Sequence, residues 1–159
     1  MNHWLMKSEP EDFSVADLAK IKRSAWTGVR NYQARNHMRS MAVGDLVIFY
    51  HSSAEPPGAA GIANVTRTGV VDETQFDKKS EYYDEAATKQ APRWDCVEIA
   101  HVETFPALVP LDAMRAAPAL KDMLLLKRGI RLSVQPVSAG EFKTVLTLAK
   151  KTSVSSRRS

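Results

Sequence analysis

The feature that most constrains the fold is the apolar run of residues 46–51, which follows the Gly44-Asp45 turn and is apolar until its end. Hydrophobic residues on both faces predict a strand that is covered on both sides, so this strand is expected to be central in its sheet. Its polar end, Tyr50 to Ser52, emerges where a strand meets a loop, which is a usual location for binding groups.

Shorter patterns on either side predict the remaining elements. Strands are expected at residues 3–7, 61–67, 94–105 and 130–136. Ser14 with Asp17, and Ser138 with Glu141, have the spacing of capping boxes and predict helices to about residue 22 and over 139–149. Further helices are expected at 33–41 and 110–114. About five strands with irregularly placed helices predict an α+β domain whose mostly antiparallel, curved sheet forms a small barrel.

Two polar stretches lack such patterns. Residues 70–93 are too many for a hairpin turn, so they form either a functional cover or a mobile excursion. Residues 152–159 contain only Ser, Thr, Val and Arg, and we expect a disordered tail there. The predicted domain is therefore residues 1–151.

Composition bounds the class of protein. No apolar run approaches the roughly 18 residues of a membrane span, and the N-terminus lacks a signal-peptide pattern. A single cysteine, Cys96, cannot form an internal disulfide, which fits a reducing compartment. The sequence therefore predicts a cytoplasmic protein without a membrane partner, and we expect a monomer.

Positive charge is concentrated in one part of the chain. Residues 20–40 contain six cations and no Asp or Glu. Such a segment suits attraction to phosphates, although a solvated helix face would explain the charge alone equally well. The candidate phosphate-binding residues are Lys22, Arg23, Arg30, Arg35 and Arg39.

The same segment contains Trp26, Asn31 and Tyr32 around Gly28, which suggests one wall of a pocket for a flat, uncharged group such as a nucleobase. Stacking on an aromatic ring contributes roughly 1–3 kcal/mol per base, whichever base it is. Selectivity then needs short neutral hydrogen-bonding groups. Ser8, Asn31, Tyr50 and Ser133 could supply them. The alternatives stay open, because Asn31 could simply cap the next helix and Trp26 and Trp94 could be core residues.

Signatures of catalysis are mostly missing from the sequence. There is no phosphate-binding loop and no dinucleotide fingerprint. The four histidines and Cys96 lack metal-ligand spacing, so neither a metal nor another cofactor is expected. Two alternatives to a binding module remain. One is an enzyme acting on a nucleobase or nucleotide with His51 as general base, and the other is a module for a small molecule or peptide.

Four ordered motifs resemble the EVE domain family, to which the thymocyte-nuclear-protein-like proteins belong. They are Trp4-Leu5-Met6-Lys7-Ser8-Glu9-Pro10, Gly28-Val29-Arg30-Asn31-Tyr32-Gln33-Ala34-Arg35-Asn36, Gly44-Asp45 with Phe49-Tyr50-His51-Ser52, and Arg131-Leu132-Ser133-Val134-Gln135-Pro136. The resemblance runs from about residue 3 to residue 148. Residues 54–60 form a slightly longer loop than is expected after the His-Ser pair, which leaves the shape of the pocket mouth open.

The resemblance implies a PUA-like fold, similar to YTH domains, which hold a methylated adenine of RNA in an aromatic cage. EVE domains are regarded as non-catalytic readers of modified bases in DNA or RNA. By this likeness, Ser8 and Trp26 would line the pocket, Asn31 would contact the base edge and Trp94 would form the second stacking wall. The other pocket candidates are Tyr32, Tyr50, His51, Ser52 and Ser133.

Overall fold

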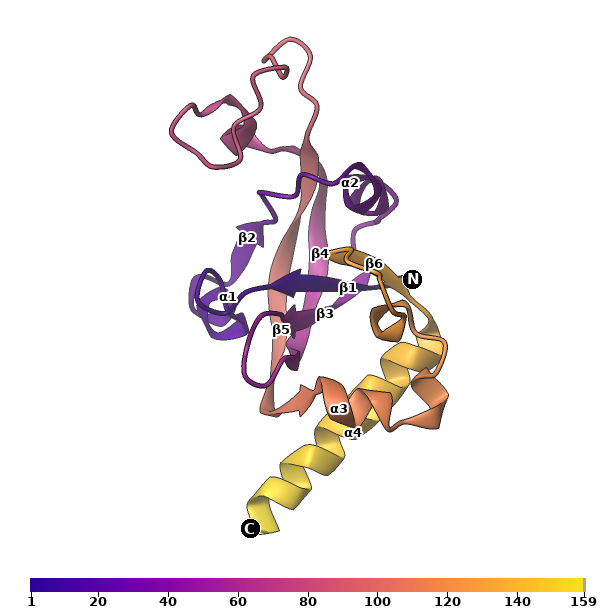
Figure 1. Cartoon of the computed structure of the whole chain (residues 1–159). Helices are drawn as coiled ribbons and strands as arrows, with labels where there is room; N and C mark the ends of the chain where they lie inside the picture. The colour runs from indigo at the N-terminus through magenta and orange to yellow at the C-terminus, as the bar shows by residue number, and fades with distance from the viewer. Residues whose placement is uncertain (159) are drawn as a thin grey trace.

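The computed structural model describes the backbone of residues 1–158 and the side chains of residues 1–151. Its strands are β1 His3–Ser8, β2 Arg23–Ala25, β3 Leu46–His51, β4 Gly58–Val71, β5 Asp95–Pro110 and β6 Val134–Val137. They form one mixed sheet in the order β2-β5-β4-β3-β1-β6 (Figure 1). The predicted α+β class is confirmed.

Strand β3 is central, as its sequence predicted. It pairs parallel to β1, with Leu5 opposite Ile48, and antiparallel to β4, with Ile62 opposite Ile48. Val47, Ile48 and Phe49 are fully buried. The β1–β3 pair is parallel and the other four described pairings are antiparallel, so the sheet is mostly antiparallel.

The barrel is not confirmed. Strands β2 and β6 lie at the two edges of the sheet, and no pairing among the described residues joins them. The short strand β2, which pairs with β5 through Ser24 and Ile99, was not predicted and brings the number of strands to six. Curvature comes from the long strands β4 and β5, whose register shifts at several points.

Close backbone contact between β4 and β5 depends on glycine. A Cβ atom at Gly61 would lie 2.3 Å from the Glu103 carbonyl oxygen, and one at Gly58 would lie 2.2 Å from that of Val109. These contacts explain why a strand rich in glycine and alanine lies beside the central strand.

The helices are α1 Val15–Ile21, α2 Tyr32–Arg39, α3 Leu111–Arg115 and α4 Ala139–Arg158, with 3₁₀ turns η1 Glu73–Phe76, η2 Pro118–Leu120 and η3 Leu124–Leu126. Both predicted capping boxes are present: the Asp17 amide donates to Ser14 and the Glu141 amide to Ser138, each at 3.1 Å. Within the described residues, no helix is long and apolar enough to span a bilayer. The predicted tail falls among residues whose side chains are not described, so that prediction and the domain boundary stay predictions.

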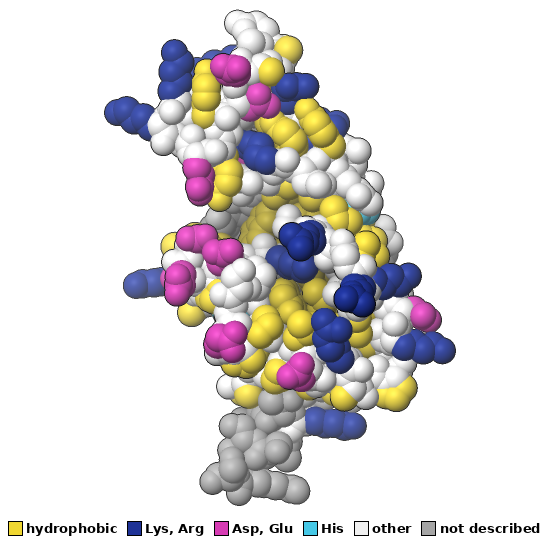
Figure 2. Space-filling view, viewed as in Figure 1, with side chains coloured by type: hydrophobic (Ala, Val, Ile, Leu, Met, Phe, Trp, Pro, Cys, Tyr) yellow, Lys and Arg dark blue, Asp and Glu magenta, His cyan; other side chains and the backbone are white. Residues whose placement is uncertain are grey.

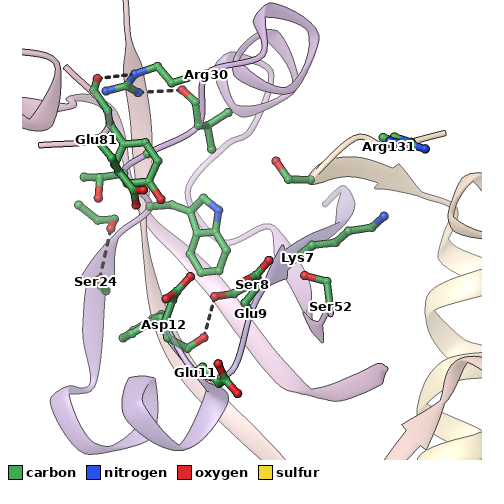
Figure 3. A pocket seen from close by; sticks show the side chains of 18 residues that line it. Lys7, Ser8, Glu9, Glu11, Asp12, Ser24, Arg30, Ser52, Glu81 and Arg131 are labelled. Atoms are coloured by element: carbon green, nitrogen blue, oxygen red, sulfur yellow. Dashed lines mark hydrogen bonds between the residues drawn. The ribbon is translucent and has the colours of Figure 1, made fainter. Parts of the chain in front are cut away.

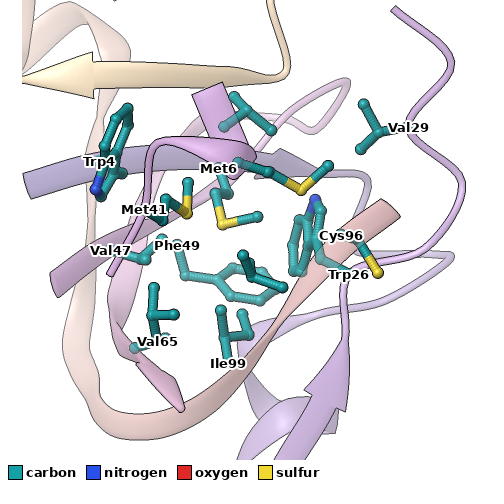
Figure 4. Packing of buried hydrophobic residues seen from close by; sticks show 14 of the residues in the cluster. Trp4, Met6, Trp26, Val29, Met41, Val47, Phe49, Val65, Cys96 and Ile99 are labelled. Carbon is teal, nitrogen blue, oxygen red and sulfur yellow. The ribbon is translucent and has the colours of Figure 1, made fainter. Parts of the chain in front are cut away.

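The two faces of the sheet carry separate cores because side chains alternate along each strand. Val47 and Phe49 of β3 point into one core, which also contains Trp26 (Figure 4). Ile48 and Tyr50 point into the other, which is covered by α3 and α4. Trp26 therefore places the candidate site on the face that α1 and α2 cover.

Residues 72–94, between β4 and β5, form an excursion that extends from one end of the sheet, while α4 lies at the other end (Figure 1). Fully buried Gln75 closes the base of this excursion. Its Nε2 donates to the Asp72 and Trp94 carbonyls, both at 2.7 Å, and its Oε1 accepts from the Arg93 and Trp94 amides. Of the two predicted alternatives, this hydrogen-bonded base favours a cover over a mobile excursion.

Candidate functional site

A pocket of ≈ 1010 Å³ opens where the end of β1, residues 24–30, residues 131–133 and the excursion meet (Figure 3). Its lining contains Lys7, Ser8, Glu9, Glu11, Asp12, Phe13, Ser24, Ala25, Trp26, Thr27, Gly28, Val29, Arg30, Ser52, Glu81, Tyr82, Arg131 and Ser133. Five of the predicted site residues are among them: Ser8, Trp26, Arg30, Ser52 and Ser133.

Trp26 belongs to both the core and the pocket. Only 8% of it is exposed, and its ring packs edge-on against Phe49, with the ring centroids 5.4 Å apart (Figure 4). The indole nitrogens of Trp4 and Trp94 donate to Asp45 and Asp84. That of Trp26 has no partner among the described residues and is not sealed from solvent. The pocket therefore contains an unused indole N–H donor.

Serine residues gather where three chain segments meet. The Lys7 amide donates to the Ser133 carbonyl at 2.8 Å, and the Ser52 amide donates to the Ser8 carbonyl at 3.0 Å. The Ser8 hydroxyl donates to the Phe13 carbonyl at 2.6 Å. The hydroxyls of Ser52 and Ser133 make no hydrogen bond within the described part of the chain. They can therefore serve a ligand as neutral donors or acceptors.

The excursion supplies the wall beside Gly28. Gly28 has a positive φ of +86°, and a Cβ atom there would lie 2.8 Å from a ring carbon of Tyr82. Arg30 Nε donates to the Tyr82 carbonyl at 2.9 Å, and the guanidinium lies 5.7 Å from the Tyr82 ring centroid. Absence of a side chain at Gly28 thus allows Tyr82 to pack against this backbone and line the pocket.

Asp72 fixes this wall to the body of the protein. It is 1% exposed and accepts hydrogen bonds from the Gly28 amide at 2.8 Å, from Arg30 at 2.9 Å and from Thr74. Burial would raise the pKa of this carboxyl, but the hydrogen bonds from Arg30, Thr74 and Gly28 outweigh burial and lower the pKa. Arg30 is therefore a structural partner of Asp72 within the lining.

Asn31, Tyr32 and Trp94 do not line the pocket. Asn31 caps α2, because its Oδ1 accepts from the Ala34 amide at 2.9 Å. Trp94 is stacked on Tyr32, with centroids 4.8 Å apart, and donates to Asp84 at 2.8 Å. The structure thus places the expected base-edge amide at a helix terminus and the expected second aromatic wall in a separate stack.

Tyr50 and His51 also lie outside the pocket lining. Tyr50 is buried in the other core, and this burial raises the pKa of its hydroxyl. His51 Nε2 accepts from the Val15 amide at 3.1 Å, which satisfies the first N–H of α1. Burial lowers the pKa of His51, although Asp17 opposes this effect. The ring therefore serves the fold as a neutral acceptor.

The other candidate cations lie away from the pocket lining as well. Arg35 donates to the Arg93 carbonyl at 2.8 Å, and Arg39 forms an ion pair with Asp95 at 2.6 Å. Exposed Lys22 and Arg23 lie at the α1–β2 junction. Arg30, Arg35 and Arg39 are thus held by contacts within the protein, whereas Lys22 and Arg23 are exposed.

Charged side chains that the sequence interpretation missed line two sides of the pocket. Lys7 and Arg131 lie on the side of β6, whereas Glu11, Asp12 and Glu81 lie away from Arg131, and Glu9 lies beside Ser8 (Figure 3). The space-filling view shows dark blue side chains on one side of the hollow and magenta ones on the other (Figure 2). Lys7 and Arg131 each lie in a motif identified from sequence, but both lie outside the cation-rich segment.

The described residues contain no candidate metal site, and their one cysteine is buried. Among the described residues, no three His, Cys, Asp or Glu side chains are grouped so that they could hold a metal ion. Cys96 is buried, and burial raises the pKa of its thiol to about 12. The reactive thiolate is therefore scarcely populated at neutral pH.

Comparisons with a family model and with individual known proteins agree on one family. The model of the EVE domain matches residues 2–148. Thymocyte nuclear protein 1 from Homo sapiens is 38% identical, with 94% of this chain and 75% of that protein covered. The protein of the same name from Danio rerio is 40% identical, with 92% and 71% covered.

Solved structures give the same result. A crystal structure of a Pseudomonas putida protein has a TM-score of 0.89 at 44% identity and covers 92% of this chain and 99% of its own. A crystal structure of the human THYN1 protein in complex with DNA containing 5-methylcytosine has a TM-score of 0.88 at 37% identity. It covers 94% of this chain and 98% of its own.

Proposed function

We propose that this chain, which belongs to the EVE domain family, is a non-catalytic nucleic-acid-binding module that takes a modified base into the pocket beside Trp26. The observation that carries the proposal is the unused hydrogen-bonding groups of Trp26, Ser52 and Ser133 within one aromatic-lined pocket. The similar human THYN1 protein, in complex with DNA containing 5-methylcytosine, supports DNA with a modified cytosine as the first ligand to test.

The pocket has the chemistry that a flipped base requires. Extrusion from a duplex costs a few kcal/mol, which contacts to the base edge and face must offset. The Trp26 indole N–H can donate to a carbonyl or ring nitrogen, while the serine hydroxyls can donate or accept. A methyl group on the base can pack against Phe13 and Val29. Burying one methyl contributes about 0.8 kcal/mol, which corresponds to about fourfold in affinity.

The placement of His51 supports a binding role over the predicted enzyme alternative. A general base must reach the proton that it removes, directly or through one water. The candidate base His51 is outside the pocket lining and already accepts the Val15 amide. The enzyme hypothesis that names His51 as the general base is therefore not supported by the position of its ring.

The first prediction concerns discrimination between bases. In titrations at fixed salt, we expect tighter binding of an oligonucleotide with one 5-methylcytosine than of its unmodified twin, in DNA and RNA versions. Trp26→Phe keeps a packed ring but removes the N–H, and a neutral hydrogen bond contributes about 0.5–1.5 kcal/mol. The affinity for the modified oligonucleotide should therefore fall by about two- to tenfold.

Trp94→Phe is the matched control, because it removes an indole N–H that donates to Asp84 outside the pocket. This variant should keep the discrimination ratio of the wild type. Asn31→Ala should keep it as well, while the lost cap lowers the free energy of unfolding by about 1 kcal/mol. Equal affinity of the wild type for every modified and plain oligonucleotide would overturn the proposal.

A further inference from the structure

Three of the four guanidinium groups expected to bind phosphate are engaged within the protein, and the fourth, that of exposed Arg23, is outside the pocket lining. Arg30 donates to Asp72, to Thr74 and to two backbone carbonyls. Arg39 is paired with Asp95, and Arg35 donates to a backbone carbonyl of the excursion. A phosphate that bound these groups would have to replace contacts that already satisfy them, so the gain on binding would be small.

Lys7 and Arg131 differ from these arginines. Both line the pocket, and neither forms a hydrogen bond or ion pair through its side chain with any other described residue. Lys7 is half-buried, and this desolvation lowers the pKa of its ammonium group. A phosphate beside Lys7 would stabilise its charged form and offset the desolvation.

The sheet brings these two cations to the same side of the pocket. The Lys7 amide donates to the Ser133 carbonyl, so the end of β1 lies beside the start of β6. Leu132 and Val134 are buried, whereas Arg131 is exposed and Ser133 partly exposed, and both of these line the pocket. Figure 3 shows Lys7 and Arg131 on this side, away from Glu81. Lys7 and Arg131 thus come from neighbouring segments that both line the pocket.

Acidic side chains make the other side unfavourable for phosphate. Glu11, Asp12 and Glu81 contribute to the lining away from Arg131, whereas Glu9 lies beside Ser8 (Figure 3). Phosphates are repelled by carboxylates and attracted by cations, so an entering strand has one preferred side. The division of charge is visible across the hollow in Figure 2.

We propose that Lys7 and Arg131 hold the phosphates that flank the bound nucleotide, so that the strand approaches the pocket from the side of β6. The identity of the ligand as nucleic acid rests on the proposed function. Within the cation-rich segment, Arg30 then serves to support the pocket wall through its contacts with Asp72 and the Tyr82 carbonyl.

The second prediction is a change in salt dependence. The slope of log Kd against log salt concentration would be measured for the wild type, Lys7→Gln and Arg131→Gln, with methylated and plain oligonucleotides. Loss of one phosphate contact should reduce the magnitude of the slope by about 0.9 on duplex DNA and about 0.7 on single strands. Both oligonucleotides should weaken equally, because phosphate contacts carry no base information.

Arg35→Gln and Arg39→Gln are matched controls, since each removes one guanidinium charge, and both should keep the slope of the wild type. Lys7→Arg retains the charge and should also keep it, which separates loss of charge from a folding defect. An unchanged slope in Lys7→Gln and Arg131→Gln, or a reduced slope in the controls, would overturn the assignment.

Failure of the two proposals looks different in this experiment. If Lys7 and Arg131 set the slope but methylated and plain oligonucleotides bind equally, the base-reading function fails and the phosphate assignment holds. If methylated DNA is preferred but the slope depends on Arg35 or Arg39, the base-reading function holds and the phosphate assignment fails. Absence of binding to every oligonucleotide would overturn both.

Discussion

Trp26 shows how single residues in this protein serve the fold and the site together. Its ring fills the core against Phe49 and Phe13, while its indole N–H is left unused in the pocket. Truncation to alanine would remove a large buried ring, which typically destabilises a protein by about 3–5 kcal/mol. Substitutions that keep an aromatic ring therefore separate binding from folding.

Asp72 also contributes both to the fold and to the pocket wall, and the third prediction concerns its charge. Asp72→Asn should lower the free energy of unfolding by about 3 kcal/mol at neutral pH. The substitution replaces the buried carboxylate, which accepts from charged Arg30 and from the Gly28 and Thr74 amides, with a neutral amide. The folded-state pKa of Asp72 lies below its unfolded value. Its contribution is therefore complete above about pH 4 and is lost as the pH falls through the folded-state pKa.

Urea unfolding over a series of pH values measures this contribution. The stabilities of the wild type and Asp72→Asn should differ by a constant amount above about pH 4 and converge below it. A difference that stays constant down to the lowest pH would show that the carboxylate does not stabilise the pocket wall as its contacts indicate.

Part of the pocket could be predicted from individual residues. Ser8, Ser52 and Ser133 were predicted from three of the family motifs, and the structure brings them together. Asn31 could not be assigned, since an amide that caps a helix looks the same in sequence as one that reads a base. Tyr82 and Lys7 were missed because only the folded chain places the excursion and β1 beside Trp26.

At the level of elements, the excursion between β4 and β5 is held at two places. Gln75 closes its base, and Asp72 and Arg30 tie it to the segment that contains Gly28. These bonds place the Tyr82 ring against the Gly28 backbone. The excursion is therefore part of the pocket wall, and its position depends on contacts with residues far away in sequence.

The fourth prediction compares two glycines. Gly28→Ala and Gly69→Ala both place a side chain at a positive φ, of +86° and +63°, which costs about 1–2 kcal/mol. Only at Gly28 would the new Cβ meet the Tyr82 ring, since nothing lies within 4 Å at Gly69. We expect both variants to be less stable to urea, but only Gly28→Ala to bind oligonucleotides more weakly.

Oligonucleotide titration beside urea unfolding distinguishes the two effects. Equal binding by both glycine variants would mean that the position of Tyr82 does not matter for the ligand. Limited proteolysis of the excursion adds a direct readout, with faster cleavage expected near residue 82 in Gly28→Ala only.

Elements with local signals were predicted well, and those that depend on pairing were not. Ser14 and Ser138 mark their helices because capping chemistry acts within a few residues. The three-residue strand β2 has no periodic pattern of its own and exists because it pairs with β5. Closure into a barrel depends on the whole sheet, and the edge positions of β2 and β6 do not confirm it.

Across the whole molecule, the sheet separates two cores, and the pocket opens on one of its faces. Acidic and basic side chains line different sides of that pocket. Net charge is only +4, so the arrangement of charge, more than its total, would orient a nucleic-acid strand. The cations proposed to hold phosphate and the groups proposed to contact the base therefore line the same pocket.

The most direct test of the central claim, and the fifth prediction, uses the three tryptophans as NMR reporters. Their indole N–H signals would be followed by ¹⁵N–¹H spectra during titration with an oligonucleotide that contains 5-methylcytosine, with Trp26→Phe and Trp94→Phe for assignment. We predict a saturable shift of the Trp26 signal, while those of Trp4 and Trp94, bonded to Asp45 and Asp84, stay in place. Saturable binding that leaves the Trp26 signal unmoved would contradict the account.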